Sequence, residues 1–210
     1  MQELLATVTL LKHSIENSLS FFLNLSLLLT VLMFLFRITQ PYMNLLGIIP
    51  RKWYGLPGII TAPFIHASWE HLLFNLIPLY ALSAMMISFG FDFYWNITWI
   101  FIIASNTLIW IIAPPATYVG ASALISAYWG FLVIAAIMGK HSIINYFIFF
   151  VCVYYFIGIF AGIFPSQKQV SWQGHLLGML TGVLLYLLCN YYPSIRHLLL
   201  EKPYLFSSPF

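Results

Sequence analysis

Long apolar runs separated by short polar or turn-forming segments dominate this chain. A bilayer core about 30 Å thick needs about 20 apolar residues of helix to cross it, and six runs approach that length. They cover Leu19 to Phe36, Glu70 to Phe89, Trp95 to Ala113, Gly120 to Met138, Ile143 to Phe164 and Trp172 to Tyr192. The pattern predicts an all-α integral membrane protein in which six transmembrane helices form one bundle.

The ends of these runs predict how the chain is divided. Turn or polar residues stand between several of them, at Asp92, at Pro114 and Pro115, and at residues 139–141 and 165–169. The first run continues into Arg37 without a small-residue cleavage site, which favours a retained helix over a signal peptide. We therefore expect an N-terminal segment over residues 1–18, a membrane domain over residues 19–192 and a tail over residues 193–210.

The segment between the first two runs has an unusual composition. It contains seven Pro and Gly residues, too many for one helix, at positions 41, 47, 50, 55, 57, 58 and 63. It is also too apolar and aromatic for a solvated loop, as Arg51-Lys52-Trp53-Tyr54 illustrates. This mixture predicts a first loop that lies in the membrane interface.

Composition excludes several other classes of protein. Charged residues make up 6% of the chain, against roughly 25% in a soluble domain, and 62% of residues are hydrophobic. An aromatic content of 19% argues against disorder, and two cysteines cannot build a disulfide-rich scaffold. Basic residues are scattered singly, so nucleic acid is not an expected partner, whereas the lipid bilayer is. Four basic residues fall on each side of the predicted bundle, so charge alone does not fix its orientation.

Three clusters with candidate chemistry stand at the starts of the second, fourth and sixth runs. The cluster at the second run contains His66, His71 and Asn75. The cluster at the fourth run contains Gly120, Ala121 and Ser122, and the cluster at the sixth run contains Gly174, His175, Gly178 and Gly182. In an alternating bundle these three helices run in the same direction. Their starts therefore share one face of the membrane, and polar groups within membrane spans are functional candidates by default.

Ser122 and His175 have the chemistry of a nucleophile and its base. A serine needs an adjacent base to become nucleophilic, and histidine is the usual one. Ser122 also begins a helix, where free N–H groups and the positive dipole end favour a developing anion. His71 and Asn75, four residues apart, share one helix face and are candidates for an oxyanion hole together with backbone N–H groups.

Small residues predict that the fourth and sixth helices pack closely. In the sixth run, glycine recurs at every fourth position, at Gly174, Gly178 and Gly182. The fourth run has a matching face of small residues after Ser122, formed by Ala123, Ala127 and Gly130. Such faces would let Ser122 and His175 approach to about 2.6–3.2 Å. Of the five acidic residues only Glu70 lies on this membrane face, adjacent to His71, so we expect a Ser–His dyad without a carboxylate.

Other interpretations of the same residues stay open at this point. A helical serine usually bonds to its own backbone, and an intramembrane histidine or asparagine often serves packing. A transporter would need an acid or a paired site near the midplane, where only scattered residues such as Asn106 occur. Three histidines, His66, His71 and His175, could bind zinc, but the His-Glu-x-x-His motif is absent. We expect no metal and no cofactor.

Taken together, the motifs resemble those of rhomboid intramembrane serine proteases of the minimal six-helix bacterial type. The matching pieces are His66-x4-His71-x3-Asn75, Gly120-Ala121-Ser122-Ala123 and Gly174-His175-x2-Gly178-x3-Gly182. The resemblance implies that Ser122 is the nucleophile and His175 the base. It also implies that His71, Asn75 and the N–H groups of Ala121 and Ser122 bind the oxyanion, and that His66 ties the first loop to the helix below.

The resemblance carries further expectations. It implies a cytoplasmic N-terminus, an active site that opens to the outer face of a bacterial inner membrane, and transmembrane segments of other proteins as substrates. It also implies a movable gate in the fifth run and in the loop before the sixth. A catalytically inactive relative that binds transmembrane helices is the alternative, and the oligomeric state is left undetermined.

The chain departs from the family pattern at several places. Ala123 follows the serine where glycine is common, and Gly174 precedes the histidine where alanine is common. Ser126 stands where many members carry a tyrosine that stacks on the catalytic histidine. The Trp-Arg pair of the first loop and the acid near the end of the second run are missing. These differences concern substrate preference and stability more than catalytic competence.

Overall fold

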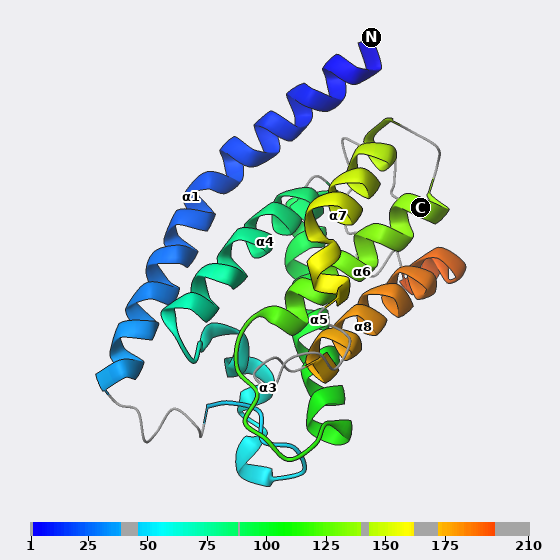
Figure 1. Cartoon of the computed structure of the whole chain (residues 1–210). Helices are drawn as coiled ribbons and strands as arrows, with labels where there is room; N and C mark the ends of the chain where they lie inside the picture. Colours follow the sequence, from blue (N-terminus) through cyan, green and yellow to red (C-terminus); the bar gives the residue numbers. More distant parts are fainter. Residues whose placement is uncertain (1, 39–45, 88, 140–142, 162–171, 196–210) are drawn as a thin grey trace.

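The computed structural model describes residues 2–38, 46–87, 89–139, 143–161 and 172–195. Six long helices account for most of them: α1 (Gln2–Ile38), α4 (Trp69–Ile87), α5 (Phe91–Ile112), α6 (Ser122–Met138), α7 (Ile143–Ala161) and α8 (Trp172–Tyr191). Figure 1 shows the helices packed side by side, with the N-terminal part of α1 extending beyond the others. The all-α class is therefore confirmed for the described part of the chain.

Each predicted apolar run coincides with one long helix, and most boundaries differ by only a few residues. α1 is the exception, because it begins at Gln2 and includes most of the segment expected before the membrane domain. α5 begins at Phe91 rather than Trp95, after Gly90 has turned the chain with φ 116°. Asp92 then falls in the first helical turn, where the helix dipole favours a negative charge.

Within the described residues, three helices are both long and apolar enough to cross a membrane: α4, α5 and α8. The other three contain shorter apolar stretches, at Phe21–Leu35, Ser122–Met138 and Asn145–Tyr154. The number of six spans therefore stays a prediction. The predicted loop over residues 165–169 and residues 196–210 of the predicted tail lie outside the described residues.

α6 forms the centre of the bundle. Residues 123–132 of this helix are all buried, and Tyr128, Phe131 and Leu132 are completely inaccessible to solvent. A helix that is apolar all round is stable only when neighbours cover it on all sides. α8 makes the most extensive contact with α6, and α7, α4 and α5 cover its remaining faces.

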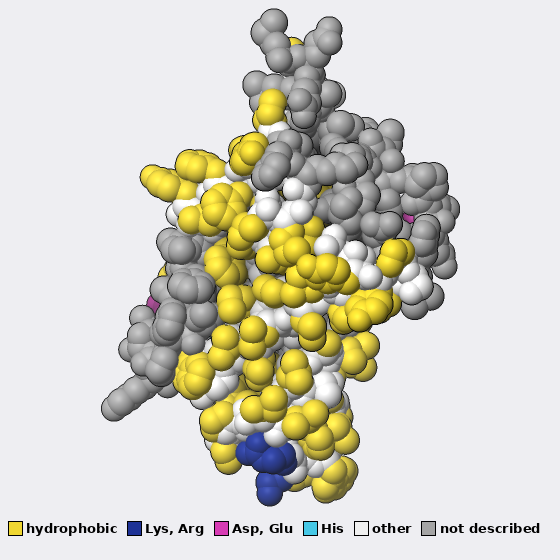
Figure 2. Space-filling view, turned by 90° about the vertical axis from the view of Figure 1, so that its right-hand side faces the viewer, with side chains coloured by type: hydrophobic (Ala, Val, Ile, Leu, Met, Phe, Trp, Pro, Cys, Tyr) yellow, Lys and Arg dark blue, Asp and Glu magenta, His cyan; other side chains and the backbone are white. Residues whose placement is uncertain are grey.

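The outward-facing side chains of the bundle are largely apolar. Phe74 and Ile77 of α4 are 76% and 70% exposed, and α7 presents Tyr146, Phe150 and Tyr154. In the coloured part of Figure 2 hydrophobic side chains predominate, and Lys and Arg side chains lie at the lower end. Soluble monomers rarely expose contiguous apolar surface of this extent, whereas a bilayer covers it.

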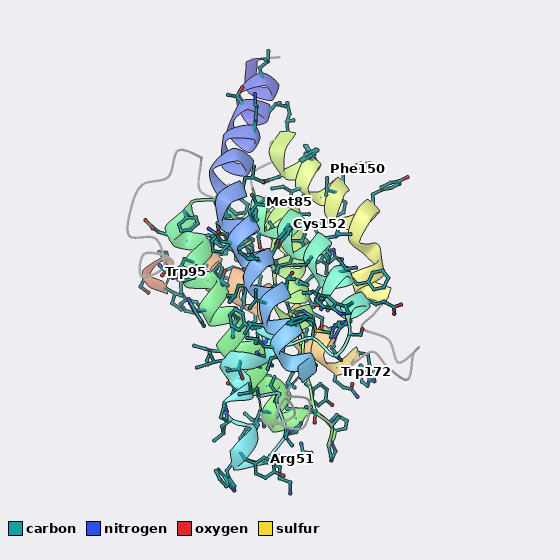
Figure 3. All side chains as sticks on the ribbon, turned by 90° about the vertical axis from the view of Figure 1, so that its left-hand side faces the viewer. Arg51, Met85, Trp95, Phe150, Cys152 and Trp172 are labelled. Carbon is teal, nitrogen blue, oxygen red and sulfur yellow. The ribbon has the colours of Figure 1, made fainter. Side chains whose placement is uncertain are left out.

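Hydrogen bonds between helices satisfy polar groups inside the bundle. The Thr98 hydroxyl of α5 lies 2.6 Å from the Tyr128 hydroxyl of α6, and the Trp129 indole N–H donates to the Cys152 carbonyl of α7 at 2.9 Å. Figure 3 shows Cys152 among the packed helices. In the absence of water each such bond removes the cost of an unpaired polar group, so these contacts also fix how the helices sit against one another.

The first loop is described from residue 46 and consists of three short helical turns: η1 (Trp53–Gly55), α3 (Gly58–Thr61) and η2 (Ala62–Phe64). This is the broken structure that its Pro and Gly content predicts. Trp53 is 79% exposed, and Arg51 lies at one extreme end of the molecule in Figure 3. The predicted position of this loop in the membrane interface stays a prediction.

Candidate active site

The start of α4 places His71 and Asn75. Ser68 caps this helix, because its hydroxyl accepts a hydrogen bond from the His71 N–H at 3.0 Å and its carbonyl accepts one from Leu72 at 3.0 Å. The cap fixes the backbone at His71, and Asn75 follows one helical turn later on the same face. His71 is half-buried and Asn75 is buried.

Both of these side chains lie against the backbone of Gly120. A Cβ atom at position 120 would lie 2.6 Å from Cε1 and 2.7 Å from Nε2 of His71, and 3.3 Å from Nδ2 of Asn75. Gly120 also has φ 103°, a backbone conformation that glycine adopts without steric cost. The structure therefore brings the predicted His71, Asn75 and Gly120 together, two residues before Ser122.

Ser122 is the first residue of α6. The earliest backbone bond of this helix runs from the Ile125 N–H to the Ala121 carbonyl at 2.9 Å, and the Ala121 side chain provides no cap. The N–H groups of residues 122–124 consequently have no acceptor within the helix. They concentrate partial positive charge where the Ser122 side chain is attached.

Glycines bring α8 against α6 at the same end of the bundle. A Cβ at Gly178 would collide with the Ala123 carbonyl, and one at Gly182 would collide with the Ala127 carbonyl. These pairings show that the two helices run in the same direction in backbone contact. His175 precedes Gly178 by three residues and lies on the same side of α8, toward the start of α6.

His175 also lies close enough to His71 for the two rings to interact electrostatically. His71 is therefore close to Gly120 and also within electrostatic range of His175. The three predicted clusters converge on one place, since α4 supplies His71, α6 supplies Gly120 and Ser122 at its start, and α8 supplies His175.

Several buried polar atoms at this place have no hydrogen-bond partner among the described residues. They are Nδ2 of Asn75, both ring nitrogens of His66 and the hydroxyl of Ser126. The His66 and His71 rings meet edge to face, with centroids 5.2 Å apart. Burial, together with the neighbouring His71, lowers the pKa of His66 from 6.5 to about 3, so this imidazole is neutral at physiological pH.

Two other residues near these helix starts in sequence lie apart from the site. Tyr128 packs in the bundle core against Thr98 and Tyr94, and Glu70 is exposed to solvent. Among the described residues, no group of three His, Cys, Asp or Glu side chains is arranged to hold a metal ion. The expectation of a site without metal or cofactor stays a prediction, as does the gate, whose loop lies outside the described residues.

Sequence reasoning missed the contacts that hold residues 113–121, the loop before Ser122, in place. The Gly120 N–H donates to the Ala62 carbonyl at 2.9 Å, and Ile48 and Tyr118 exchange two backbone hydrogen bonds of 2.9 Å. Both contacts join the first loop to residues 113–121, which precede Ser122. They involve backbone atoms of residues far apart in sequence, so no residue pattern signals them.

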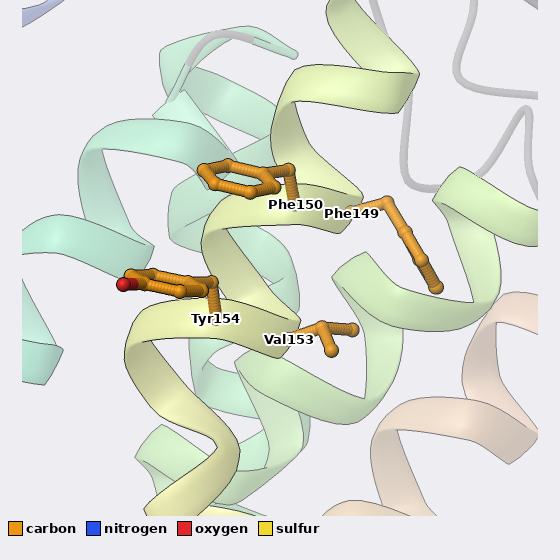
Figure 4. Close-up of a pocket in the computed structure, with 4 residues that line it drawn as sticks. All are labelled: Phe149, Phe150, Val153 and Tyr154. Carbon is orange, nitrogen blue, oxygen red and sulfur yellow. The ribbon is translucent and has the colours of Figure 1, made fainter.

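A pocket on the surface of α7 contains none of these residues. It encloses about 530 Å³ and is lined by Phe149, Phe150, Val153 and Tyr154 of α7. Figure 4 shows all four side chains on this single helix, and the rings of Phe150 and Tyr154 stack with centroids 5.2 Å apart. Its lining is apolar and belongs to the outward-facing surface of the bundle.

An all-helical bundle with an apolar surface and with polar groups gathered at the starts of three helices defines a membrane-embedded protein. Residues 50–192 match the rhomboid domain family, and the chain belongs to the rhomboid family. This finding confirms the resemblance seen in the motifs.

Mycobacterial proteins are similar to this chain. Uncharacterized proteins of Mycobacterium bovis and Mycobacterium tuberculosis are each 37% identical over an alignment of 150 residues, and the match covers 65% of this chain. An uncharacterized protein of Mycobacterium leprae is 32% identical over 151 residues, again 65% of this chain. The matched regions span 60% of the first two relatives and 57% of the third.

Proposed function

We propose that this protein is an intramembrane serine endopeptidase that cleaves transmembrane segments of other membrane proteins. Ser122 is the nucleophile and His175 is its base, without a carboxylate partner. The observation that carries the proposal is the convergence at the start of α6. There the His71 ring and the Asn75 amide lie against Gly120, and Gly178 brings α8, with His175, against Ala123.

The unpaired amide of Asn75 supports an oxyanion hole. A buried donor without an acceptor costs about 1–3 kcal/mol, and such groups in native proteins call for an explanation. A tetrahedral intermediate on Ser122 would supply the acceptor, because its oxyanion would form beside Gly120, which Nδ2 of Asn75 already approaches. His71 and the free N–H groups at the start of α6 would share that negative charge.

The proposed reaction follows serine-protease chemistry. The Ser122 hydroxyl attacks the scissile carbonyl carbon while His175 accepts its proton, and the oxyanion forms beside Asn75 and His71. The C–N bond then breaks as His175 returns the proton to the leaving amine, which leaves an ester on Ser122. Water hydrolyses this ester in a second step, with His175 again serving as base and then as acid.

Substrate class and topology follow from the membrane setting. A helical backbone is fully hydrogen-bonded and its carbonyls cannot be attacked, so helix-breaking residues near the scissile bond favour cleavage. We propose a bacterial inner-membrane location with a cytoplasmic N-terminus and the site open to the outer face. The bacterial origin of the similar mycobacterial proteins supports this location.

Cleavage in proteoliposomes tests the proposal. The protein is reconstituted with single-span reporter proteins whose spans carry a central Gly-Pro pair, and the products are identified by mass spectrometry. We expect cuts within or beside the span for the wild type and none for Ser122→Ala or His175→Ala.

A matched control is Ser105→Ala, since Ser105 is a buried helical serine whose hydroxyl bonds to its own helix at the Phe101 carbonyl. This variant should cut like the wild type. Equal cleavage by Ser122→Ala would contradict the proposal. A folded wild type that binds the reporters without cutting them would favour the inactive relative instead.

A further inference from the structure

Arg51 is fastened to the end of α5 by its side chain and its backbone. Its Nη1 donates to the Ala113 carbonyl at 2.7 Å and to the Ile111 carbonyl at 3.1 Å. Its backbone N–H donates to the Trp110 carbonyl at 3.0 Å. The last carbonyls of a helix receive no hydrogen bond from within the helix, and they carry partial negative charge. A guanidinium donates hydrogen bonds to these carbonyls, and its positive charge is attracted to them.

The backbone at Arg51 indicates that its side chain is needed there. Arg51 is the one non-glycine residue with positive φ among the described residues, at 59°. Glycine occupies this left-handed conformation without the steric cost that a Cβ atom brings. Arg51 adopts this unfavourable conformation and makes three hydrogen bonds in it, two of them through its side chain. This indicates that the arginine side chain has a role that glycine could not serve.

The carbonyls that Arg51 binds lie where α5 passes into the loop that leads to Ser122. α5 ends at Ile112, and residues 113–121 then run directly to the first residue of α6. The Ile48–Tyr118 bridge and the bond from the Gly120 N–H to the Ala62 carbonyl hold the same loop further along. The first loop is thus hydrogen-bonded to residues 113–121 near their start, middle and end, and Arg51 makes the contact at the start.

Two further contacts join the first loop to α5 around this point. The Trp110 indole donates to the Lys52 carbonyl at 3.0 Å, and the Asn106 amide donates to the Ile59 carbonyl at 2.8 Å. Arg51 also acts on Tyr118 at the middle of the loop. Burial raises the pKa of the Tyr118 phenol, and the Arg51 cation partly offsets that rise.

We propose that Arg51 is a positioning residue for Ser122. Its guanidinium fixes the end of α5 and thereby the path of residues 113–121, which set Gly120 against His71 and Asn75 and place Ser122 at the start of α6. This inference rests on the proposed function, since it assigns Arg51 a part in placing the proposed nucleophile. A shift of about 1 Å at a reacting group can lower a rate about a hundredfold, so a distant fastening of this kind affects catalysis.

Arg51→Gly tests the inference sharply, because glycine suits the left-handed backbone and removes only the side chain. We expect the rate at which a fluorophosphonate labels Ser122 to fall about tenfold, measured well below the unfolding temperature. Hydrogen exchange should rise at the Tyr118 and Gly120 amides and stay unchanged in α8. Arg51→Lys should recover part of the labelling rate, because it keeps the charge but lacks the planar fork of donors.

Lys52→Gln is the matched control, since it removes the neighbouring positive charge and leaves the Lys52 carbonyl in place; it should match the wild type. The inference would be overturned if Arg51→Gly showed the labelling rate and hydrogen exchange of the wild type. It would also be overturned if hydrogen exchange rose equally in every helix. If Arg51→Gly does not fold, Arg51→Lys decides, and wild-type exchange over residues 113–121 in that variant would count against Arg51. An unlabelled wild type would refute the proposed nucleophile, whereas the exchange data would still report whether Arg51 holds the loop.

Discussion

The two sides of Ser122 are built in different ways. Toward α8, glycines bring two helices into backbone contact, and the neighbouring groups are packed without space for even a methyl group. Toward α4 and the first loop, the contacts are hydrogen bonds and polar rings, and several buried polar atoms have no hydrogen-bond partner within the described part of the chain. The first side is stabilised by packing, whereas the second keeps polar donors available at a cost in stability.

This contrast suggests a division of labour within the proposed site. Packing fixes the backbone of the proposed base, because the Cα of His175 can shift little unless α8 moves against α6. Unpaired polar groups are suited to serve as the proposed oxyanion donors, because a donor already paired in the resting protein would have to break that bond first. Substitutions on the packed side should therefore affect stability and activity together, and substitutions on the polar side should affect activity much more than stability.

Gly178→Val should have the largest effect, since it attacks the packed side. Its Cβ would meet the Ala123 carbonyl, a backbone atom that cannot move aside without moving α6. We expect a loss of about 1–3 kcal/mol in stability together with nearly complete loss of labelling at Ser122. Thermal unfolding in detergent and labelling rates measure the two losses.

Leu184→Val is the control for that substitution, because Leu184 is exposed on the same helix. It should change neither property appreciably. If Gly178→Val retained wild-type stability, the close approach of α8 to α6 would not be what holds this side together.

Asn75→Ala attacks the polar side and should leave stability nearly unchanged, since it removes a buried donor that has no partner. The cleavage rate should fall by up to about 10²–10³-fold if Asn75 is the main oxyanion donor, and by less if His71 and the backbone share the charge. Phe74→Ala, on the outward face one residue earlier, serves as control. An unchanged rate in Asn75→Ala would remove this residue from the site.

Gly120→Ala tests the point where the polar side meets Ser122. The new methyl group would press on the His71 ring and the Asn75 amide, and the backbone would have to hold alanine at φ 103°. We expect a fall in labelling rate of about tenfold or more. Gly139→Ala, at an ordinary φ of −70° after α6, should behave like the wild type; equal losses in both variants would argue against a specific role for Gly120.

The smallest expected effect on catalysis belongs to His66, which acts instead through a dependence of stability on pH. Burial and the nearby His71 lower its pKa to about 3 in the folded protein, against 6.5 for an exposed histidine. Between these values the unfolded chain binds one proton more than the folded protein, so stability is complete above pH 6.5 and falls as the pH drops toward 3. Unfolding temperatures at pH 7 and pH 4.5 measure this slope, and His66→Phe should flatten it; an unchanged slope in the variant would assign it to other groups.

Much of the fold was predictable because its signals are local. Apolar runs and the turn residues between them located the helices, and the spacing of Gly178 and Gly182 indicated the contact with α6 that the structure shows. The length of α1 was not predicted, since the expectation relied on apolar runs and residues 2–18 mix polar with apolar side chains.

The sequence was less informative about the polar side of the site. His71 and Asn75 were recognisable from their helical spacing, but their contact with Gly120 depends on a loop from elsewhere in the chain. The hydrogen bonds of Arg51 to Ile111 and Ala113 join residues that are 60 and 62 positions apart in the sequence. Their acceptors are backbone carbonyls, which any residue provides. Such contacts become visible only when the chain has folded.

The most direct test of the central claim is to map the covalent adduct that a fluorophosphonate forms with the purified protein. An activated Ser122 predicts one adduct, located on Ser122 by peptide mass spectrometry, absent from Ser122→Ala and strongly slowed in His175→Ala. An adduct on another serine, or equal labelling in His175→Ala, would contradict the account. So would a folded wild type that takes up no label at all.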